Sequence, residues 1–150
     1  MVSRMCCVAQ GPSMIATKHL RILVADDQPQ IRRAVRALIE SYNPDWKVIA
    51  EAADGREAVE RAEELHPDVI IMDLSMPNLN GLEATRTIHR AYPSISILIF
   101  TAHDSPSLPG AARDAGAKGL VVKSDSSRFL IPAVQTVSDC RTFFGREQGS

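Results

Sequence analysis

The feature that most constrains the fold of this chain is a regular alternation of short apolar runs with longer segments of helical period. Five runs rich in Ile, Leu and Val are predicted as strands, at residues 21–25, 47–51, 69–72, 95–100 and 119–122. Three of them are nearly continuous in these residue types, which is typical of strands buried on both faces of a parallel sheet. The pattern therefore indicates a sheet enclosed between layers of helices.

A helical segment follows each of these runs. In the first segment Ile31, Val35, Leu38 and Ile39 fall on one face, with arginines on the other. The remaining helices are predicted at residues 55–66, 82–92, 109–115 and 127–144, and the fourth has the weakest pattern. Five strand–helix units in series predict an α/β fold with a doubly wound parallel sheet, because the crossovers between parallel strands are almost always right-handed.

Length and charge exclude several classes of protein. The 150 residues suit one compact domain, and the formal net charge of −1 gives no overall attraction to nucleic acid or to an anionic membrane. No stretch approaches the ~20 apolar residues that cross a bilayer. We expect residues 1–18 to be a disordered leader rather than a signal peptide, and residues 145–150 to be a short tail.

The cysteines bear on the compartment. Cys6, Cys7 and Cys140 make an odd number without a spaced framework. This argues against a disulfide scaffold and favours a reducing, cytoplasmic environment.

The residues that carry chemistry stand at the ends of the predicted strands. Asp26 and Asp27 follow the first strand, Asp73 the third, Thr101 the fourth and Lys123 the fifth. In a doubly wound sheet these carboxyl ends meet at one edge, where ligands bind. Three carboxylates in one pocket repel each other and so require a divalent cation, and all-oxygen ligands favour Mg²⁺. The set suits phosphorylation of an aspartate, with a hydroxyl donor and a lysine beside the phosphoryl group.

Each of these residues also has an ordinary structural explanation. Asp26 or Thr101 alone is most simply a helix cap, Asp73 a turn residue, and Asp27 or Lys123 a solvated side chain. Taken singly, the structural explanation is the better one. Five compatible residue types at the ends of four separate strands favour a shared site.

Four segments in the right order resemble the receiver domain of two-component response regulators. They are ILVADDQPQIRR, PDVIIMDLSMPNLNGLEATRTI, ILIFTAHD and AGAKGLVVK, and the resemblance covers about residues 20–137. The motif DLSMPNLNG is the most specific of them. The sequence of these segments is most similar to that of receivers from regulators with a helix-turn-helix output domain. The resemblance implies a flavodoxin-like (βα)5 fold with strand order 2-1-3-4-5, and a receiver domain at residues 19–144.

The resemblance also implies roles for individual residues. Asp73 would be the phosphoacceptor, and Mg²⁺ would be held by Asp26, Asp27, Asp73 and the backbone carbonyl of Ser75. Thr101 and Lys123 would bind the phosphoryl group. Beside them, Pro77 and Gly81 would shape the adjoining loop, and Ser75 and His103 would tune the rate of phosphoryl loss.

The implied function is a phosphorylation-activated signalling switch and not a turnover enzyme. Its partners would be a cognate histidine kinase or phosphotransfer protein and a downstream protein or output domain, with a second copy of the chain as a further candidate. Two outputs stay open: action through protein contacts, or service as the receiver of a longer DNA-binding regulator. We expect no specific DNA binding by these 150 residues alone, because only 13 residues follow Val137, too few for a helix-turn-helix domain. We also expect no membrane partner.

Three features depart from the family pattern. Leu120 stands where the family has a switch aromatic, and Ser124 where many members have proline. Prolines lie in the segments of the fourth and fifth helices, at Pro106, Pro109 and Pro132. Since these segments form the family's signalling face, we hypothesise that the phosphorylation chemistry is retained while the output surface is unusual or poorly ordered.

Two other functions compete with the switch. A haloacid-dehalogenase-like phosphatase would use an aspartyl phosphate in a D-x-D motif, but Asp73 is followed by Leu74 and Ser75. A pseudo-receiver that only makes protein contacts is expected to lack one or more pocket residues, and all five are present here.

Overall fold

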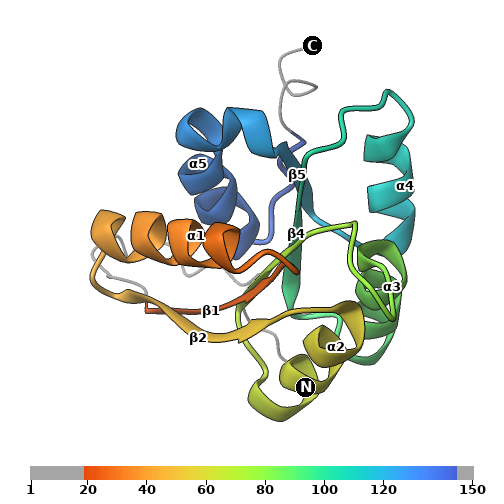
Figure 1. Ribbon diagram of the computed structural model, residues 1–150, viewed down its shortest axis with the longest axis horizontal. Coiled ribbons are helices and arrows are strands. Elements are labelled where there is room, and N and C mark those ends of the chain that lie inside the picture. Colours follow the sequence, from red (N-terminus) through yellow and green to blue (C-terminus); the bar gives the residue numbers. More distant parts are fainter. Residues whose placement is uncertain (1–18, 145–150) are drawn as a thin grey trace.

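The computed structural model describes residues 19–144, so the predicted leader at 1–18 and tail at 145–150 lie outside the described residues. Within these residues strands and helices alternate (Figure 1). Their bounds are β1 Leu20–Ala25, α1 Pro29–Tyr42, β2 Trp46–Ala52, α2 Gly55–Leu65, β3 Val69–Met72, α3 Gly81–Ala91, β4 Ser96–Thr101, α4 Leu108–Ala115, β5 Gly119–Val122 and α5 Ser126–Ser138. A single 3-10 turn, Lys123–Asp125, joins β5 to α5.

The five strands form one parallel sheet in the order β2-β1-β3-β4-β5, which confirms the predicted fold class. Helices α1 and α5 cover one face, and α2, α3 and α4 cover the other (Figure 1). The chain moves outward from β1 in one direction to β2 and in the other direction to β3. The carboxyl ends of β1 and β3 therefore flank the switch point of the sheet, where ligands bind in such folds.

The core consists of two apolar layers on opposite faces of the sheet. The layer under α2, α3 and α4 includes Ile70, Met72 and Ile97, and the layer under α1 and α5 includes Ile71 and Leu98. Every residue of β3 and of β4 is buried. These central strands are enclosed on both faces, which explains their continuous apolar sequences.

A bulge in β2 changes the direction in which its last residues point. Ile22 pairs with Val48 but Leu23 pairs with Ala50, so Ile49 is an extra residue in β2. Val48 packs in the layer under α1, whereas Ala50 packs against the opposite layer. A bulge reverses the side-chain alternation beyond it. Glu51 is thereby directed toward α1.

The predicted end of the fifth helix was wrong. Helix α5 ends at Ser138, not near Phe144, and the chain then turns back to the sheet. Phe143 forms a parallel bridge with Gly119, and its carbonyl accepts a hydrogen bond of 2.8 Å from the Leu120 N–H. Gly119 permits this approach, because a Cβ there would lie 2.5 Å from the Phe143 oxygen. Residues 141–144, here called the C-terminal segment, thus cover the outer edge of β5.

Aromatic contacts hold the C-terminal segment in place. Phe144 is buried in the layer under α4, and the Arg113 guanidinium of α4 lies 4.1 Å from the centre of its ring. On the other face of the sheet, the ring centres of Phe129 and Phe143 are 6.0 Å apart. Both layers of the core therefore extend onto residues beyond α5.

Pro109 and Pro132 occupy different positions in their helices. The weakly patterned α4 does form a helix, with Pro109 in its first turn, where a missing N–H costs nothing. Pro132 lies in the interior of α5, which begins at Ser126 and not after the proline. Its carbonyl accepts a hydrogen bond of 2.8 Å from the Thr136 hydroxyl.

Two further observations bear on the sequence-based expectations. Cys140 is disulfide-bonded, whereas the odd number of cysteines was interpreted as an argument against a disulfide scaffold and for a reducing environment. None of the helices in residues 19–144 has both the length and the apolar character needed to span a bilayer.

Candidate functional site

The side chains predicted from the strand ends converge at one edge of the sheet. Asp26 follows β1, Asp73 follows β3, and Lys123 follows β5. The Lys123 Nζ lies 2.7 Å from Asp26 Oδ2 and 3.5 Å from Asp73 Oδ1. Carboxylate oxygens of Asp26, Asp27 and Asp73 lie within 4.8 Å of one another. The structure thus brings together residues that are up to 97 positions apart in the sequence.

Asp26 is the most firmly held member of this cluster. Its backbone N–H donates to the Ala52 carbonyl at 3.0 Å, and its Oδ1 accepts from the Gln28 N–H at 2.9 Å. Oδ2 is fully buried and, within the described residues, has no aligned hydrogen bond, although the Lys123 ammonium lies close by. A buried carboxylate oxygen with spare acceptor capacity fits a metal ligand.

Asp73 is buried, and its environment disfavours the charged form. Burial raises the pKa of its carboxyl above the usual value, and repulsion from Asp26 raises it further, while the Lys123 ammonium opposes both. Lys123 thus lies beside two carboxylates of a cluster that contains three. A hard divalent cation would neutralise the remaining charge, and the all-oxygen donor set fits Mg²⁺.

Thr101 ends β4, and Ser75 and His103 lie on the loops that follow β3 and β4. The Thr101 hydroxyl is buried at the end of β4 and accepts a hydrogen bond of 3.1 Å from the His103 N–H. The Ser75 hydroxyl and His103 Nε2 are 3.0 Å apart, within hydrogen-bond distance. The two residues predicted to tune a rate therefore contact each other across the gap between the loops.

The loop between β3 and α3 depends on close backbone packing. Gly81 donates its N–H to the Leu74 carbonyl at 3.0 Å, and a Cβ at this position would lie 2.0 Å from the Asp73 oxygen. The Pro77 carbonyl accepts from the Leu79 N–H at 2.7 Å, and Asn78 adopts a φ of 65°. Gly81 is needed for close approach to Asp73 and not for a positive φ.

Leu120 lies in the core and not in the acidic cluster. It is paired with Ile99 of β4 and packs in the same apolar layer as Phe144 and Ala112. Its exposed fraction is 6%. The position of the family's aromatic residue is therefore filled by a buried aliphatic side chain that belongs to the same apolar layer as Phe144.

Sequence reasoning missed the contacts of two arginines, one of which, Arg32, reaches the site from outside. Arg32 and Arg36 were assigned to the solvent side of the first helix, but both donate hydrogen bonds to Glu51 of β2. Arg32 also donates to the backbone carbonyl of Asp26. An acidic residue at the end of a predicted strand, opposite a helix with arginines four residues apart, was the available signal.

The comparisons with known proteins agree with this geometry. The family model described as "Response regulator receiver domain" matches residues 22–135. The chain is 36% identical over 119 residues to "Transcriptional regulatory protein DegU" of Brevibacillus brevis, covering 79% of this chain and 50% of that protein. It is 39% identical over 125 residues to "Oxygen regulatory protein NreC" of Staphylococcus epidermidis, covering 83% and 57% respectively. The chain spans about half the length of these curated relatives.

A solved structure leads to the same family. It is a two-component response regulator of the LuxR family from Aurantimonas sp. SI85-9A1, with a TM-score of 0.83 and 37% identity, covering 88% of this chain and 94% of that chain. The family model accounts for most of the present chain. The chain therefore belongs to the response regulator receiver domain family, with relatives among the LuxR-type regulators.

Proposed function

We propose that this chain is a phosphorylation-activated switch that accepts a phosphoryl group on Asp73 in a Mg²⁺-dependent reaction. The carrying observation is that Lys123 and the Asp26–Asp27 pair lie beside a buried Asp73 at the switch point of the sheet. The donor would be a histidine kinase, a phosphotransfer protein or a small acyl phosphate, in the cytoplasm. The product would act on a downstream protein or output domain, or on a second copy of the chain.

The proposed reaction is a transfer and not a hydrolysis. An Asp73 carboxylate oxygen forms a bond to phosphorus while the bond from phosphorus to the donor's nitrogen or oxygen breaks, and the electron pair leaves with the donor. Bound Mg²⁺ would supply neutralisation of charge on the phosphoryl oxygens. Asp26, Asp27, Asp73 and the Ser75 carbonyl are the groups proposed to hold it.

The remaining residues position the phosphoryl group and protect it. The Lys123 ammonium lies beside the Asp73 side chain, where its positive charge would stabilise the phosphoryl oxygens. The Thr101 hydroxyl would donate a hydrogen bond to the phosphoryl group once the product forms. We propose that Ser75 and His103, whose side chains lie 3.0 Å apart, control the access of water and so set the lifetime of the acyl phosphate. Pro77 and Gly81 fix the loop that carries Ser75.

The relay to a partner would proceed without an aromatic at position 120. Leu120 has no hydroxyl, and it is already buried. We propose that the conformational change passes instead through β5, α4 and the C-terminal segment, because Leu120, Ala112 and Phe144 belong to one apolar layer. This retains the hypothesis of an unusual output surface, now with a formed fourth helix.

Intact-mass analysis after incubation with acetyl phosphate and Mg²⁺ tests the proposal. We expect an addition of roughly 80 Da, one phosphoryl group, on the wild type and none on Asp73→Asn. Asp68→Asn makes the same chemical change before β3, at the opposite edge of the sheet, and should be phosphorylated like the wild type. A wild-type chain that stays unmodified while binding partners normally would instead support a pseudo-receiver. Turnover of a generic phosphatase substrate would contradict the assignment of a switch.

A second proposal concerns the context of the domain. The relatives at 36% and 39% identity are described as regulatory proteins, and this chain matches about half of each. We propose that such a receiver controls a DNA-binding output domain in a longer regulator. The reading frame after codon 150 discriminates between this and action by protein contacts alone. A mobility-shift assay with the 150 residues should show no specific DNA binding.

A further inference from the structure

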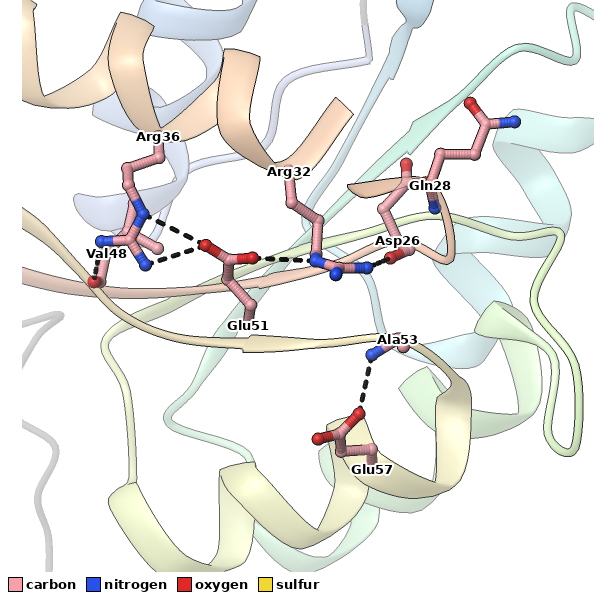
Figure 2. A network of polar contacts seen from close by, with 8 residues as sticks. All are labelled: Asp26, Gln28, Arg32, Arg36, Val48, Glu51, Ala53 and Glu57. Atoms are coloured by element: carbon pink, nitrogen blue, oxygen red, sulfur yellow. Dashed lines mark hydrogen bonds and ion pairs between the residues drawn. The ribbon is translucent and has the colours of Figure 1, made fainter. Parts of the chain in front are cut away.

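We propose that Arg32 is a positioning residue that sets the direction of the Asp26–Asp27 carboxylates for the cation. This inference rests on the proposed function, and it concerns a side chain that lies outside the acidic cluster. The Arg32 Nη1 donates a hydrogen bond of 2.7 Å to the backbone carbonyl of Asp26. Figure 2 shows its guanidinium between that carbonyl and the Glu51 carboxylate.

The contact acts on the peptide unit that joins the two aspartates. The Asp26 carbonyl and the Asp27 N–H belong to one planar group, so holding the oxygen fixes the plane from which the Asp27 side chain departs. On its other side, the N–H of Asp26 is bound to the Ala52 carbonyl. Asp27 is exposed, unlike Asp26 and Asp73. Its orientation therefore depends more on the backbone than on packing.

Arg32 is itself held rigidly. Its Nε donates to Glu51 Oε1 at 2.8 Å, so the two bonds of the guanidinium bridge β2 and the end of β1. The other Glu51 oxygen accepts two hydrogen bonds from Arg36, and Arg36 also donates to the Val48 carbonyl. Only about a sixth of the Arg32 side chain is exposed, at 17%. The bulge at Ile49 is what points Glu51 toward this arginine.

The sign of the effect separates positioning from simple electrostatics. Removing a positive charge near a cation site should by itself strengthen Mg²⁺ binding. Loss of a group that orients a ligand should weaken it, and partners of this kind commonly change metal affinity about tenfold or more. We therefore expect Arg32→Ala to weaken Mg²⁺ binding by roughly tenfold, against the direction of the charge change.

The experiment is a titration with Mg²⁺ alone, followed through the amide resonances of Asp27 and its neighbours. Arg33→Ala removes an exposed arginine next along the same helix and controls for charge. Arg36→Ala disrupts the Glu51 network without removing a bond to Asp26 and controls for loss of the network. Both controls should bind Mg²⁺ at least as tightly as the wild type, within about twofold.

A phosphorylation assay at several Mg²⁺ concentrations completes the test. For Arg32→Ala, phosphorylation by acetyl phosphate should need more Mg²⁺ but reach the wild-type rate at saturation. Arg32→Lys keeps the positive charge, but an ammonium lacks the planar fork with which the guanidinium bonds Glu51 and the Asp26 carbonyl together. Its Mg²⁺ affinity should therefore lie between those of the wild type and Arg32→Ala. If the alanine variant does not fold, the lysine variant alone still decides, because unchanged affinity in it would contradict the inference.

The possible results do not overlap. Unchanged or tighter Mg²⁺ binding by Arg32→Ala overturns the inference and leaves the proposed function standing. Equal weakening by Arg32→Ala and Arg36→Ala also overturns it, since the network as a whole would then be responsible. A wild-type chain that neither binds Mg²⁺ nor accepts a phosphoryl group overturns the proposed function itself.

Discussion

Two carboxylates on the strands that flank β1 have opposite environments. Glu51 of β2 lies between Arg32 and Arg36, with ion-pair distances of 2.8 and 2.9 Å. Burial pushes its pKa upward, but the hydrogen bonds and charges of the two arginines outweigh this and leave the pKa below its usual value. Asp73 after β3 shares a single lysine with Asp26, and its pKa is raised.

The difference separates a carboxylate that stabilises the fold from the one that we propose accepts the phosphoryl group. Glu51 carries one negative charge and faces two arginines, so its ionised form favours the folded state. Asp73 has too little positive charge nearby, so its ionised form costs stability until a cation arrives. Positive charge is thus in excess around Glu51, where α1 packs on the sheet, and in deficit around Asp73 at the switch point. Four measurements test this contrast, in order of decreasing effect.

The largest effect should follow Lys123→Met. The substitution removes the ammonium that lies beside both Asp26 and Asp73 and leaves the buried carboxylates without a counter-charge. We expect the free energy of unfolding at pH 7 without Mg²⁺ to fall by about 3 kcal/mol, as for other pairs broken from one side. Urea denaturation measures this. Saturating Mg²⁺ should restore part of the loss, and equal stability with and without the ion would argue against a cation site.

A smaller effect of opposite sign should follow Asp73→Asn. Replacing the destabilised carboxylate by an amide should raise the free energy of unfolding by about 1 to 2 kcal/mol at neutral pH without Mg²⁺. If the proposed function is right, the same variant should not accept a phosphoryl group. A loss of stability would mean that the ionised Asp73 is well matched by Lys123, and the contrast with Glu51 would then be wrong.

Glu51→Gln should destabilise the fold by about 1 kcal/mol, the upper end of what partly exposed ion pairs contribute. The loss should shrink as salt is raised from 0.05 to about 0.5 M, because screening weakens the wild-type pairs. Thermal or urea unfolding at both ionic strengths provides the check. Glu64→Gln is a matched control, because Glu64 pairs with Arg61 on the same helix and is more exposed. It should have a smaller effect.

The smallest effect is a difference in pH dependence. Because the folded-state pKa of Asp73 is raised, its cost is full above that pKa and disappears as the pH falls toward the usual 3.8. The stability gap between Asp73→Asn and the wild type should therefore narrow as the pH falls from 7 toward 4. Glu51 has a lowered pKa, so its contribution is complete above about 4.5 and is lost only below it. A gap that widens on acidification would contradict the assigned sign for Asp73.

The sequence predicted the sheet and the acidic cluster because both follow from local pattern. The apolar runs identified β3 and β5 to the residue, since strands buried on both faces carry an unbroken signal. Asp26, Asp73 and Lys123 came together because parallel strands must end at one edge. These conclusions needed no information on side-chain packing.

What the sequence did not predict depends on contacts between distant segments. The alternation in β2 points Glu51 away from α1, and only the bulge at Ile49 turns it toward Arg32. Nothing local marks that extra residue. The end of α5 was misplaced because the apolar residues Phe143 and Phe144 extend the helical pattern, although they pack on β5 and α4. In both cases tertiary contacts override the local period.

The return of the chain to β5 has a practical consequence for anyone who expresses this domain. A boundary drawn where the family match stops, at residue 135, would cut inside α5 and discard a ring that is 97% shielded from water at Phe144. The Lys118 carbonyl and the Leu120 N–H would lose their hydrogen-bond partners. The edge of β5 would then be exposed and could pair with strands of other molecules. Truncated variants should therefore be tested for aggregation at high protein concentration. A domain boundary after Phe144 keeps these contacts.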